Sequence, residues 1–289
     1  MSVPFKVDLS GEVAVVTGAG GVLCSGFAKA LAECGAKVAV CDLRADAAQK
    51  VADEITAAGG TAAAFEMNVL QKDSIIAAQA AIHEKFGAVT LLLNGAGGNN
   101  PKGTTDREYC TPEDIAELEK NGTIEGVKTF FDLDPDGISF VFNLNFLGTL
   151  LPTQVFAREM AKVGGTIINV SSMNAFCPLT KIPAYSGAKA AVSNFTQWLA
   201  VHFAPVGIRC NAIAPGFFCT DQNRALLFNP DGSLSARSAK ILNNTPMNRF
   251  GEVDDLTGTL LWLADKNASG FVTGVVVPVD GGFAAYSGV

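Results

Sequence analysis

Two side chains one helical turn apart are suited to proton transfer. Tyr185 and Lys189 lie in the segment Ala-Tyr-Ser-Gly-Ala-Lys, and on a helix side chains at this spacing share one face. A phenol donates a proton near neutral pH only if its phenolate is stabilised, and a neighbouring ammonium group provides that stabilisation. Ser172, which follows an apolar run, adds a hydroxyl that can bond the same substrate oxygen. The three residues together predict acid–base chemistry at a substrate oxygen.

A glycine-rich turn near the start of the sequence is suited to binding phosphate. It runs from Thr17 to Gly26, between an apolar run and an Ala-rich stretch with helical spacing. Glycines let the backbone approach a pyrophosphate, and the start of a helix offers free N–H groups and the positive end of its dipole. A tight turn that binds nothing explains the same pattern.

Asp42 ends the next apolar run and bears on the choice of cofactor. A carboxylate at that position can accept hydrogen bonds from ribose hydroxyls and repels a 2′-phosphate, which favours NAD over NADP. Two observations weaken this preference: Asp42 can instead cap the following helix, and Arg44 nearby can accommodate a phosphate. We therefore expect NAD, with NADP as the less favoured cofactor.

The elements that must position these residues alternate along the sequence. Apolar runs without strict alternation indicate strands buried on both faces, and amphipathic stretches between them indicate helices. We predict an α/β fold in one domain over residues 1–289: a Rossmann-like, doubly wound parallel sheet of about seven strands with helices on both faces. The expected strands are 12–17, 37–42, 61–67, 89–94, 165–170, 208–213 and 272–279. The expected helices are 26–34, 45–58, 72–86, 140–162, 184–203 and 256–263.

One long segment interrupts this alternation. Residues 99–139 are polar and punctuated by proline and glycine, with a short helical piece near Pro112–Asn121. An insertion of this length in a compact domain usually carries a function or is mobile. A substrate lid, a solvated loop and a subunit contact all remain open.

Composition argues against several functions. The net charge of −7 disfavours binding to a nucleic-acid backbone, and no His, Cys or Asp cluster has metal-ligand spacing. The seven cysteines, an odd number without a C-x-x-C pair, are typical of free thiols in a reducing compartment, so we expect a cytoplasmic protein. The first residues show no signal-peptide pattern, and no unbroken apolar run is long enough to predict a membrane span.

Together these features resemble the short-chain dehydrogenase/reductase family over essentially the whole sequence. The motifs that carry the resemblance are the glycine-rich turn, Asn-Gly-Ala-Gly at 94–97 and the Ser172, Tyr185 and Lys189 set. The resemblance implies an NAD(P)-dependent oxidoreductase that acts on CH–OH groups of a small molecule and forms homodimers or homotetramers. It also implies that Asn145 anchors a water in a proton relay that includes Lys189.

The resemblance further implies where the cofactor binds. Thr17 and Gly18 would open the cofactor turn, Asn68 and Val69 would flank the adenine, and the segment from Pro215 onward would receive the nicotinamide carboxamide. The full expected set is Thr17, Gly18, Gly20, Gly21, Val22, Leu23, Asp42, Leu43, Asn68, Val69, Asn94, Ala96, Gly97, Tyr185, Lys189, Pro215, Gly216, Phe218 and Thr220.

The sequence differs from the family pattern in its turn, in the Asn-Asn-Ala-Gly segment and in length. The family's turn reads T-G-x-x-x-G-x-G, and here Val22 and Cys24 replace the later two glycines. Gly95 replaces the second asparagine of Asn-Asn-Ala-Gly, and the interval from Asn94 to Asn145 is much longer than the family's. The pyrophosphate could therefore approach at a shifted place, next to neighbouring glycines: Gly20, Gly21 and Gly26.

A narrower resemblance concerns the substrate. Gly-Gly-Asn-Asn-Pro at 97–101, the long insertion and Ser-Ser-Met-Asn-Ala-Phe at 171–176 resemble the branch of the family that oxidises D-mannonate, the D-mannonate oxidoreductases that interconvert D-fructuronate and D-mannonate. Independently, amide and ammonium groups suit a polyhydroxylated, carboxylated ligand, although ordinary loop polarity explains them equally well. The expected substrate residues are Asn99, Asn100, Lys102 and Asn174, with Lys181 nearby.

Two other functions remain open. The first is an enzyme of the same family for another sugar, a polyol or a 3-oxoacyl compound, but the polar insertion argues against a long apolar acyl group. The second is a dinucleotide-binding protein without catalysis, which only the altered glycine turn favours. The intact set of Ser172, Tyr185, Lys189 and Asn145 argues against that second function, because no structural need requires all four.

Overall fold

One parallel sheet organises the molecule. In the part of the protein that the computed structural model describes, residues 6–220 and 224–288, seven parallel strands pair in the order β3-β2-β1-β4-β5-β6-β7. The first residues, for which no leader is predicted, lie partly outside these ranges. The strands are β1 (Val13–Thr17), β2 (Lys37–Asp42), β3 (Thr61–Glu66), β4 (Leu91–Asn94), β5 (Gly165–Val170), β6 (Ile208–Pro215) and β7 (Val276–Val279). The order reverses between β1 and β4, so the predicted doubly wound fold is confirmed.

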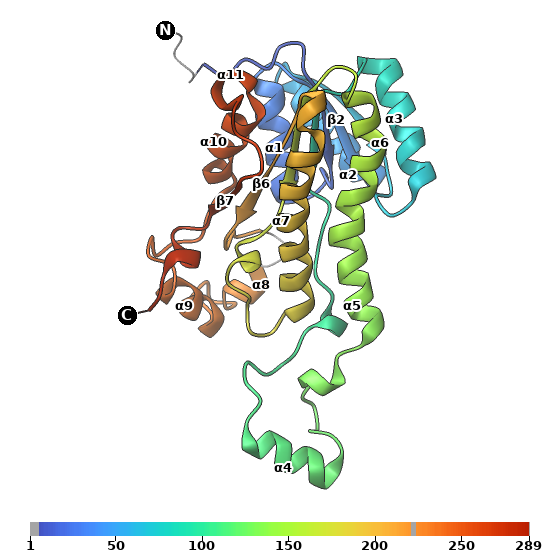
Figure 1. The fold of residues 1–289 in the computed structure, drawn as a ribbon. Coiled ribbons are helices and arrows are strands. Elements are labelled where there is room, and N and C mark those ends of the chain that lie inside the picture. Colours follow the sequence, from blue (N-terminus) through green and yellow to red (C-terminus); the bar gives the residue numbers. More distant parts are fainter. Residues whose placement is uncertain (1–5, 221–223, 289) are drawn as a thin grey trace.

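Helices cover both faces of the sheet (Figure 1). The helices are α1 (Val22–Glu33), α2 (Ala45–Ala57), α3 (Lys72–Phe86), α4 (Pro112–Asn121), α5 (Pro135–Phe142), α6 (Gly148–Met160), α7 (Pro183–Phe203), α8 (Arg224–Leu227), α9 (Ala236–Asn243), α10 (Val253–Ala264) and α11 (Lys266–Ser269). The core has two halves: α1, α2 and α10 pack on one face of the sheet, and α3, α6 and α7 pack on the other. Val16 of β1 belongs to the first half and Val15 to the second, as expected for a strand buried on both faces.

The long helix expected over 140–162 is one helical rod from Pro135 to Met160, with a π-helical turn at Asn143–Leu147 between α5 and α6. By length and composition this rod could cross a membrane, which the sequence pattern did not predict because polar residues interrupt its apolar run. In the fold, 44% of its most apolar stretch is buried, and Phe156 and Met160 lie in the core beneath the sheet. Packing against the sheet accounts for its apolar character.

Several boundaries differ from the prediction for identifiable reasons. The first helix starts earlier, at Val22, because Gly21 is its N-cap and Gly26 lies inside it. The last strand starts later, at Val276, after Gly274 takes a left-handed backbone conformation (φ 82°). No element was predicted for α8 and α9, which are short and lie close to the carboxyl ends of the strands.

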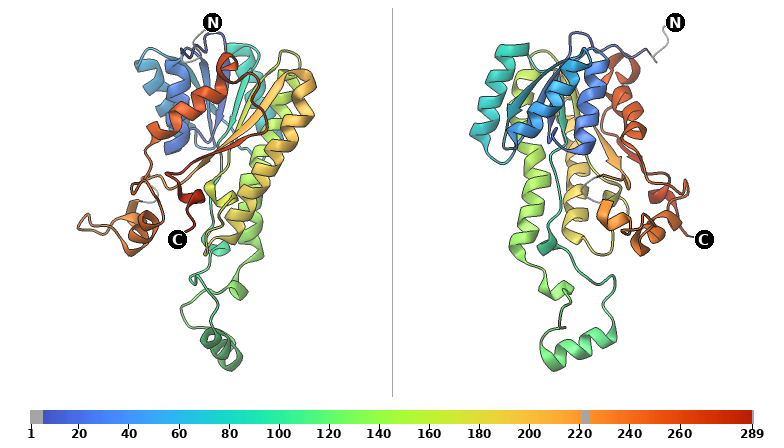
Figure 2. Two further views of the ribbon diagram at one scale, coloured as in Figure 1. Left: turned by 60° about the vertical axis from the view of Figure 1, so that its left-hand side comes forward. Right: turned by 180° about the vertical axis from the view of Figure 1, so that it is seen from behind.

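The insertion leaves the body of the molecule near the carboxyl ends of the strands. Its helix α4 has the predicted bounds and projects well away from the sheet (Figure 2). A capping box between Thr111 and Asp114 and a left-handed Gly122 (φ 72°) set the two ends of this helix. The insertion, the lobe formed by α8 and α9, and the start of α7 therefore all lie at the same end of the molecule.

Candidate active site

Ser172, Tyr185 and Lys189 meet at the carboxyl edge of the sheet. Ser172 follows β5, and α7 begins at Pro183, so its first turn presents Tyr185 to the same region. The Lys189 Nζ lies 5.7 Å from the centroid of the Tyr185 ring. All three residues therefore lie beside the point where the strand order reverses, which is where ligands of such sheets bind.

The acidity of Tyr185 differs from the expectation. The sequence predicts that Lys189 lowers the pKa of Tyr185, but burial raises it, and a hydrogen bond with Ser172 offsets only part of this effect. The physical reason is that burial disfavours the phenolate, while the Lys189 ammonium donates to the Val170 carbonyl at 2.7 Å. Burial therefore keeps Tyr185 in its protonated form at neutral pH.

Lys189 is the buried cation of the site. Its side chain is only 4% exposed, and burial lowers its pKa from 10.5 to about 8. A Cβ on Gly97 would lie 3.2 Å from Nζ and 2.6 Å from Asn145 Oδ1, so the absence of a side chain at Gly97 leaves room for both groups. Lys189 therefore remains mainly charged at neutral pH, next to the end of β4.

Asn145 lies within the π-helical turn and is fully buried. Its Nδ2 donates to the carbonyls of Gly98 (2.7 Å) and Val141 (2.8 Å), and its Oδ1 accepts from the N–H of Gly98 (3.3 Å). These bonds fasten the helical rod to the segment after β4. The predicted neighbourhood of Asn145 and Lys189 is thus present, with Gly97 between them.

The glycine-rich turn is shaped to admit a phosphate. Gly18 has a left-handed conformation (φ 66°), and a Cβ there would come within 2.9 Å of the Ala96 backbone. Helix α1 begins at Val22 behind Gly21, and no side chain of the described residues caps its first N–H groups. Free N–H groups at a helix start are anion-binding groups, so this turn fits a pyrophosphate despite the altered glycine pattern.

Gly26 serves helix packing. A Cβ on Gly26 would lie 2.1 Å from Val253 Cγ1, because α1 and α10 cross there. Gly26 therefore faces α10, and a shifted approach of the pyrophosphate through this residue has no support in the fold.

Asp42 is joined to the glycine-rich turn by hydrogen bonds. Its Oδ2 accepts from the N–H of Gly20 (2.9 Å), its Oδ1 accepts from the N–H of Arg44 (3.0 Å), and the Arg44 Nε lies 3.7 Å away. The carboxylate, 9% exposed, thus sits at the end of β2 beside the expected pyrophosphate site. A ribose placed there would share these carboxylate oxygens with the backbone.

Two expected cofactor residues turn their side chains into the protein. Thr17 Oγ1 accepts from the N–H groups of Gly95 (3.0 Å) and Ala96 (3.1 Å), which joins the ends of β1 and β4. Asn94, 1% exposed, donates from Nδ2 to Thr153 Oγ1 and Asn169 Oδ1, both at 2.9 Å. Both side chains thus stabilise the carboxyl edge of the sheet.

The other expected cofactor residues surround the same edge. Leu43 is exposed, Val69 is buried, and Asn68 bonds within its own turn by accepting from the N–H of Leu70. Val22 and Leu23 form the first turn of α1. On the far side of the edge lie the end of β6 and the segment after it: Pro215, Gly216, Phe218 and Thr220.

The expected substrate residues separate into two groups. Asn100 caps a short turn by accepting from the N–H of Lys102, the Lys102 Nζ pairs with Asp134 (3.2 Å), and Asn99 donates to Thr104. These three side chains are used by the structure of the insertion itself. Asn174 differs: it is 5% exposed, its N–H donates to Ser172 Oγ (3.3 Å), and among the described residues its Oδ1 has no hydrogen-bond partner.

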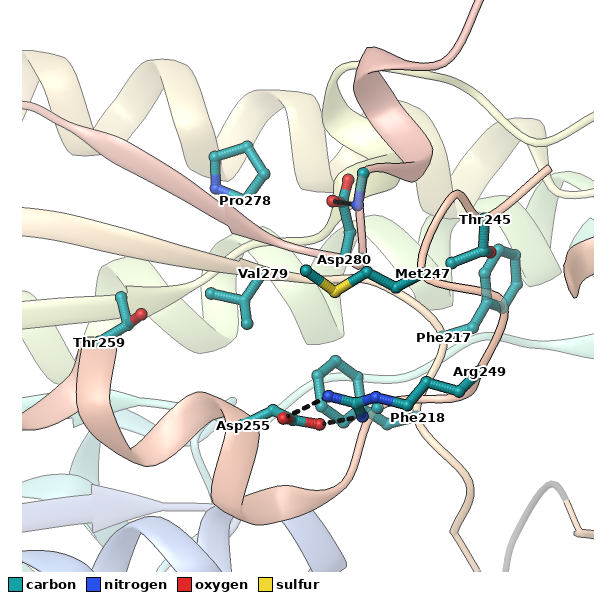
Figure 3. Close-up of a pocket in the computed structure, with 13 residues that line it drawn as sticks. Phe217, Phe218, Thr245, Met247, Arg249, Asp255, Thr259, Pro278, Val279 and Asp280 are labelled. Carbon is teal, nitrogen blue, oxygen red and sulfur yellow. Dashed lines mark hydrogen bonds and ion pairs between the residues drawn. The ribbon is translucent and has the colours of Figure 1, made fainter. Parts of the chain in front are cut away.

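A cavity of about 420 Å³ lies beside the end of β7 (Figure 3). It is lined by the segment after β6, the 245–251 loop, the start of α10 and the end of β7, and Arg249 forms a two-point ion pair with Asp255 along its wall. The guanidinium lowers the pKa of Asp255 to about 2. Of the expected site residues, Phe218 lines the cavity. Sequence reasoning missed this cavity because only tertiary packing brings its segments together.

Known proteins resemble this protein along most of its length. A family model described as short chain dehydrogenase matches residues 12–229. An uncharacterized oxidoreductase of Haemophilus influenzae is 58% identical over 290 residues, which cover 100% of this protein and 99% of the relative. The 2-dehydro-3-deoxy-D-gluconate 5-dehydrogenase of Dickeya dadantii is 32% identical over 284 residues, 96% of this protein and 97% of that enzyme. A Haemophilus influenzae crystal structure of a proposed D-mannonate oxidoreductase with bound NAD has a TM-score of 0.92 and 57% identity, covering 100% of both proteins.

Proposed function

Because this protein belongs to the short-chain dehydrogenase/reductase family, we propose that it is an NAD(H)-dependent oxidoreductase that interconverts D-fructuronate and D-mannonate. Membership of the family makes it an oxidoreductase that acts on CH–OH groups. The observation that carries the proposal is the hydrogen bond between Tyr185 and Ser172, with the Nζ of the buried Lys189 at 5.7 Å from the centroid of the Tyr185 ring. This arrangement suits proton transfer to or from the oxygen of a carbonyl or an alcohol.

Each residue has a distinct part in the proposed reaction. A bound nicotinamide supplies the hydride in reduction and accepts it in oxidation. In reduction, Tyr185 gives its proton to the substrate oxygen, and Ser172 hydrogen-bonds the same oxygen as negative charge develops on it. The Lys189 ammonium, which bonds the Val170 carbonyl in the structure, is close enough to turn to the phenolate once it forms and to stabilise it by charge. Asn145 fixes the backbone beside Lys189, where a water can link it to solvent. In oxidation Tyr185 accepts the proton instead.

The shape of the nucleotide site supports a dinucleotide cofactor. Gly18 and Gly97 leave space where a Cβ would collide with its neighbours, and the start of α1 offers uncapped N–H groups. The Asp42 carboxylate at the end of β2 supports NAD over NADP, since it would repel a 2′-phosphate. The NAD in the Haemophilus influenzae structure agrees with this choice.

Two observations support a sugar acid as the substrate. The Haemophilus influenzae structure bears the name of an enzyme for D-mannonate, and the Dickeya dadantii relative that of an enzyme for a keto-deoxy sugar acid. Within the site, the unpartnered Oδ1 of Asn174 is a buried acceptor two residues after Ser172. A substrate hydroxyl would satisfy it, because a buried polar atom without a partner costs free energy.

Assembly and location are further parts of the proposal. On α7, the rings of Phe195, Trp198 and His202 stack in a row, and Trp198 is 55% exposed. An exposed aromatic stripe on a helix supports a homodimer or homotetramer. The seven cysteines are all free, which supports a reducing compartment such as the cytoplasm.

The direct test is to mix the purified protein with NADH and D-fructuronate and to follow the loss of reduced-nicotinamide absorbance. NADPH, neutral ketoses and 3-oxoacyl compounds are assayed in parallel. We expect rapid NADH oxidation with D-fructuronate and much slower turnover with the rest. Turnover with another compound alone would replace the substrate and keep the family chemistry; NADH binding without any turnover would favour a protein that has lost catalysis.

A further inference from the structure

Three segments lie at the same end of the molecule as the start of α7, which carries Tyr185. The first is the start of the insertion, the second is the loop from Ser172 to α7, and the third is the lobe of α8 and α9 (Figure 2). The first two are joined directly, because the N–H of Thr105 donates to the Lys181 carbonyl at 2.9 Å. A small cavity of about 160 Å³ between them is lined by Thr105, Glu108 and Pro183, among others.

Glu108 joins the insertion to the third segment. Its carboxylate forms an ion pair with Lys240 of α9, a contact between residues far apart in the sequence. The hydrogen bond from Lys240 lowers the pKa of Glu108, and the positive charge of Lys181 lowers it further. One carboxylate of the protein therefore lies in the field of two lysines, and these lysines come from two different segments around the site.

We propose that Lys181 and Lys240 bind the carboxylate of the substrate, and that Glu108 yields these lysines to it when the substrate binds. The inference rests on the proposed function, because it requires an acidic substrate. A sugar acid carries its carboxylate at one end of a row of hydroxylated carbons, away from the carbon that is reduced. The cations that bind this carboxylate should therefore lie on segments around the site, as Lys181 and Lys240 do, and not beside Tyr185.

Three other cations of the insertion have partners within the insertion itself. Lys102 pairs with Asp134 and Arg107 with Asp114, all four within the insertion, while Lys128 donates to the Pro101 carbonyl. Only the Glu108–Lys240 pair, among the ion pairs of the insertion in the described ranges, crosses to another segment.

Replacing the Glu108–Lys240 ion pair by a bond from Lys240 to the substrate carboxylate costs little free energy. Lys240 is 61% exposed, and an ion pair between exposed side chains contributes little to stability because water and salt screen it. Losing the bond to Glu108 is therefore offset readily by a ligand carboxylate, which meets the same ammonium groups with the same charge-assisted hydrogen bonds. The Glu108 carboxylate already occupies the position beside Lys240, so this position accepts a carboxylate.

The test uses Lys181→Met and Lys240→Met, with Lys120→Met on the exposed side of α4 as the matched control. Steady-state kinetics are measured with D-fructuronate and with its neutral counterpart D-fructose, whose binding is measured by competitive inhibition if its turnover is too slow. We expect each of the two variants to raise KM for the acid about tenfold, the usual effect of losing a charge-assisted hydrogen bond, with kcat nearly unchanged. The neutral ketose and the Lys120 variant should show no change.

Two further variants distinguish substrate binding by these lysines from a purely structural ion pair between Glu108 and Lys240. Glu108→Gln removes the competing charge, so KM for the acid should fall severalfold. The exchange Glu108→Lys with Lys240→Glu keeps an ion pair but moves the cation, and KM should stay raised; a return to the wild-type KM would overturn the proposal. Wild-type turnover of D-fructuronate with unaffected lysine variants would also overturn it while leaving the proposed function intact. If the wild type reduces no sugar acid, the proposed function fails first and this inference fails with it.

Discussion

The Cys24 side chain fills the space beside Gly95: a Cβ added to Gly95 would lie 2.3 Å from Cys24 Sγ. Both positions depart from the family pattern, which has glycine at the first and asparagine at the second. The two departures therefore belong to one contact: because Cys24 on α1 has a side chain, residue 95 after β4 has no room for one. Burial raises the pKa of the Cys24 thiol to about 12, so the group packs and does not react.

This contact predicts coupling between the two positions. Gly95→Ala should lower the free energy of unfolding by about 1–3 kcal/mol, because the new methyl group overpacks the site against Cys24. The double variant Cys24→Gly, Gly95→Ala should lose less than the sum of the two single losses. Urea denaturation measures all three, with the exposed, uncrowded Gly258→Ala on α10 as control. Strictly additive losses would show that the two residues do not compensate each other.

Tyr185→Phe removes one hydroxyl and should leave the ring packing beside Lys189 intact. We expect kcat to fall by at least about a hundredfold, the usual contribution of a positioned acid or base, while NADH binds as before. Stopped-flow or steady-state assays give kcat, and quenching of protein fluorescence gives the NADH dissociation constant. Near wild-type turnover in this variant would remove Tyr185 from the proposed mechanism.

Asp42→Ala should shift the cofactor preference toward NADP. The variant removes a negative charge that faces the position of a 2′-phosphate and leaves the Arg44 guanidinium free to pair with one. The ratio of kcat/KM with NADPH to kcat/KM with NADH should rise about tenfold or more, as expected for losing a close charge repulsion. Asp46→Ala, in the first turn of the next helix, is the control. An unchanged ratio would mean that Asp42 does not contact the ribose.

The rate of reduction should fall as pH rises past about 8. Reduction needs a protonated Tyr185 and a charged Lys189; burial raises the pKa of Tyr185 and lowers the pKa of Lys189 to about 8. The lysine therefore loses its charge before the tyrosine loses its proton. A pH profile of kcat/KM for reduction should show this falling limb, and Lys189→Arg should move the limb upward in whatever activity remains. A profile that stays flat well into the alkaline range would contradict this assignment.

Trp198→Glu should dissociate the proposed homo-oligomer. The substitution places a charge within the exposed aromatic row on α7, where an interface would bury it. Light scattering coupled to gel filtration should show a smaller species than the wild type. Gln197→Glu adds the same charge at an exposed neighbouring position of the helix and should leave the mass unchanged. Equal masses for all three proteins would place the interface elsewhere.

The sequence determined the architecture and singled out the groups that we propose to react. Apolar runs buried on both faces predict a parallel sheet, and a Tyr and a Lys one helical turn apart necessarily share a helix face, because both patterns follow from local geometry. The helix of the insertion was predictable for the same reason, since its capping residues are neighbours in the sequence.

Tertiary structure alone decided how the site is tuned and enclosed. The raised pKa of Tyr185 depends on burial, and the matching of Cys24 to Gly95 and the pairing of Glu108 with Lys240 depend on distant segments meeting. No local pattern encodes such meetings, because they result from how the helices and loops pack at the carboxyl edge of the sheet. The protein therefore carries its chemistry in local motifs, whereas the environment that adjusts this chemistry exists only in the folded state.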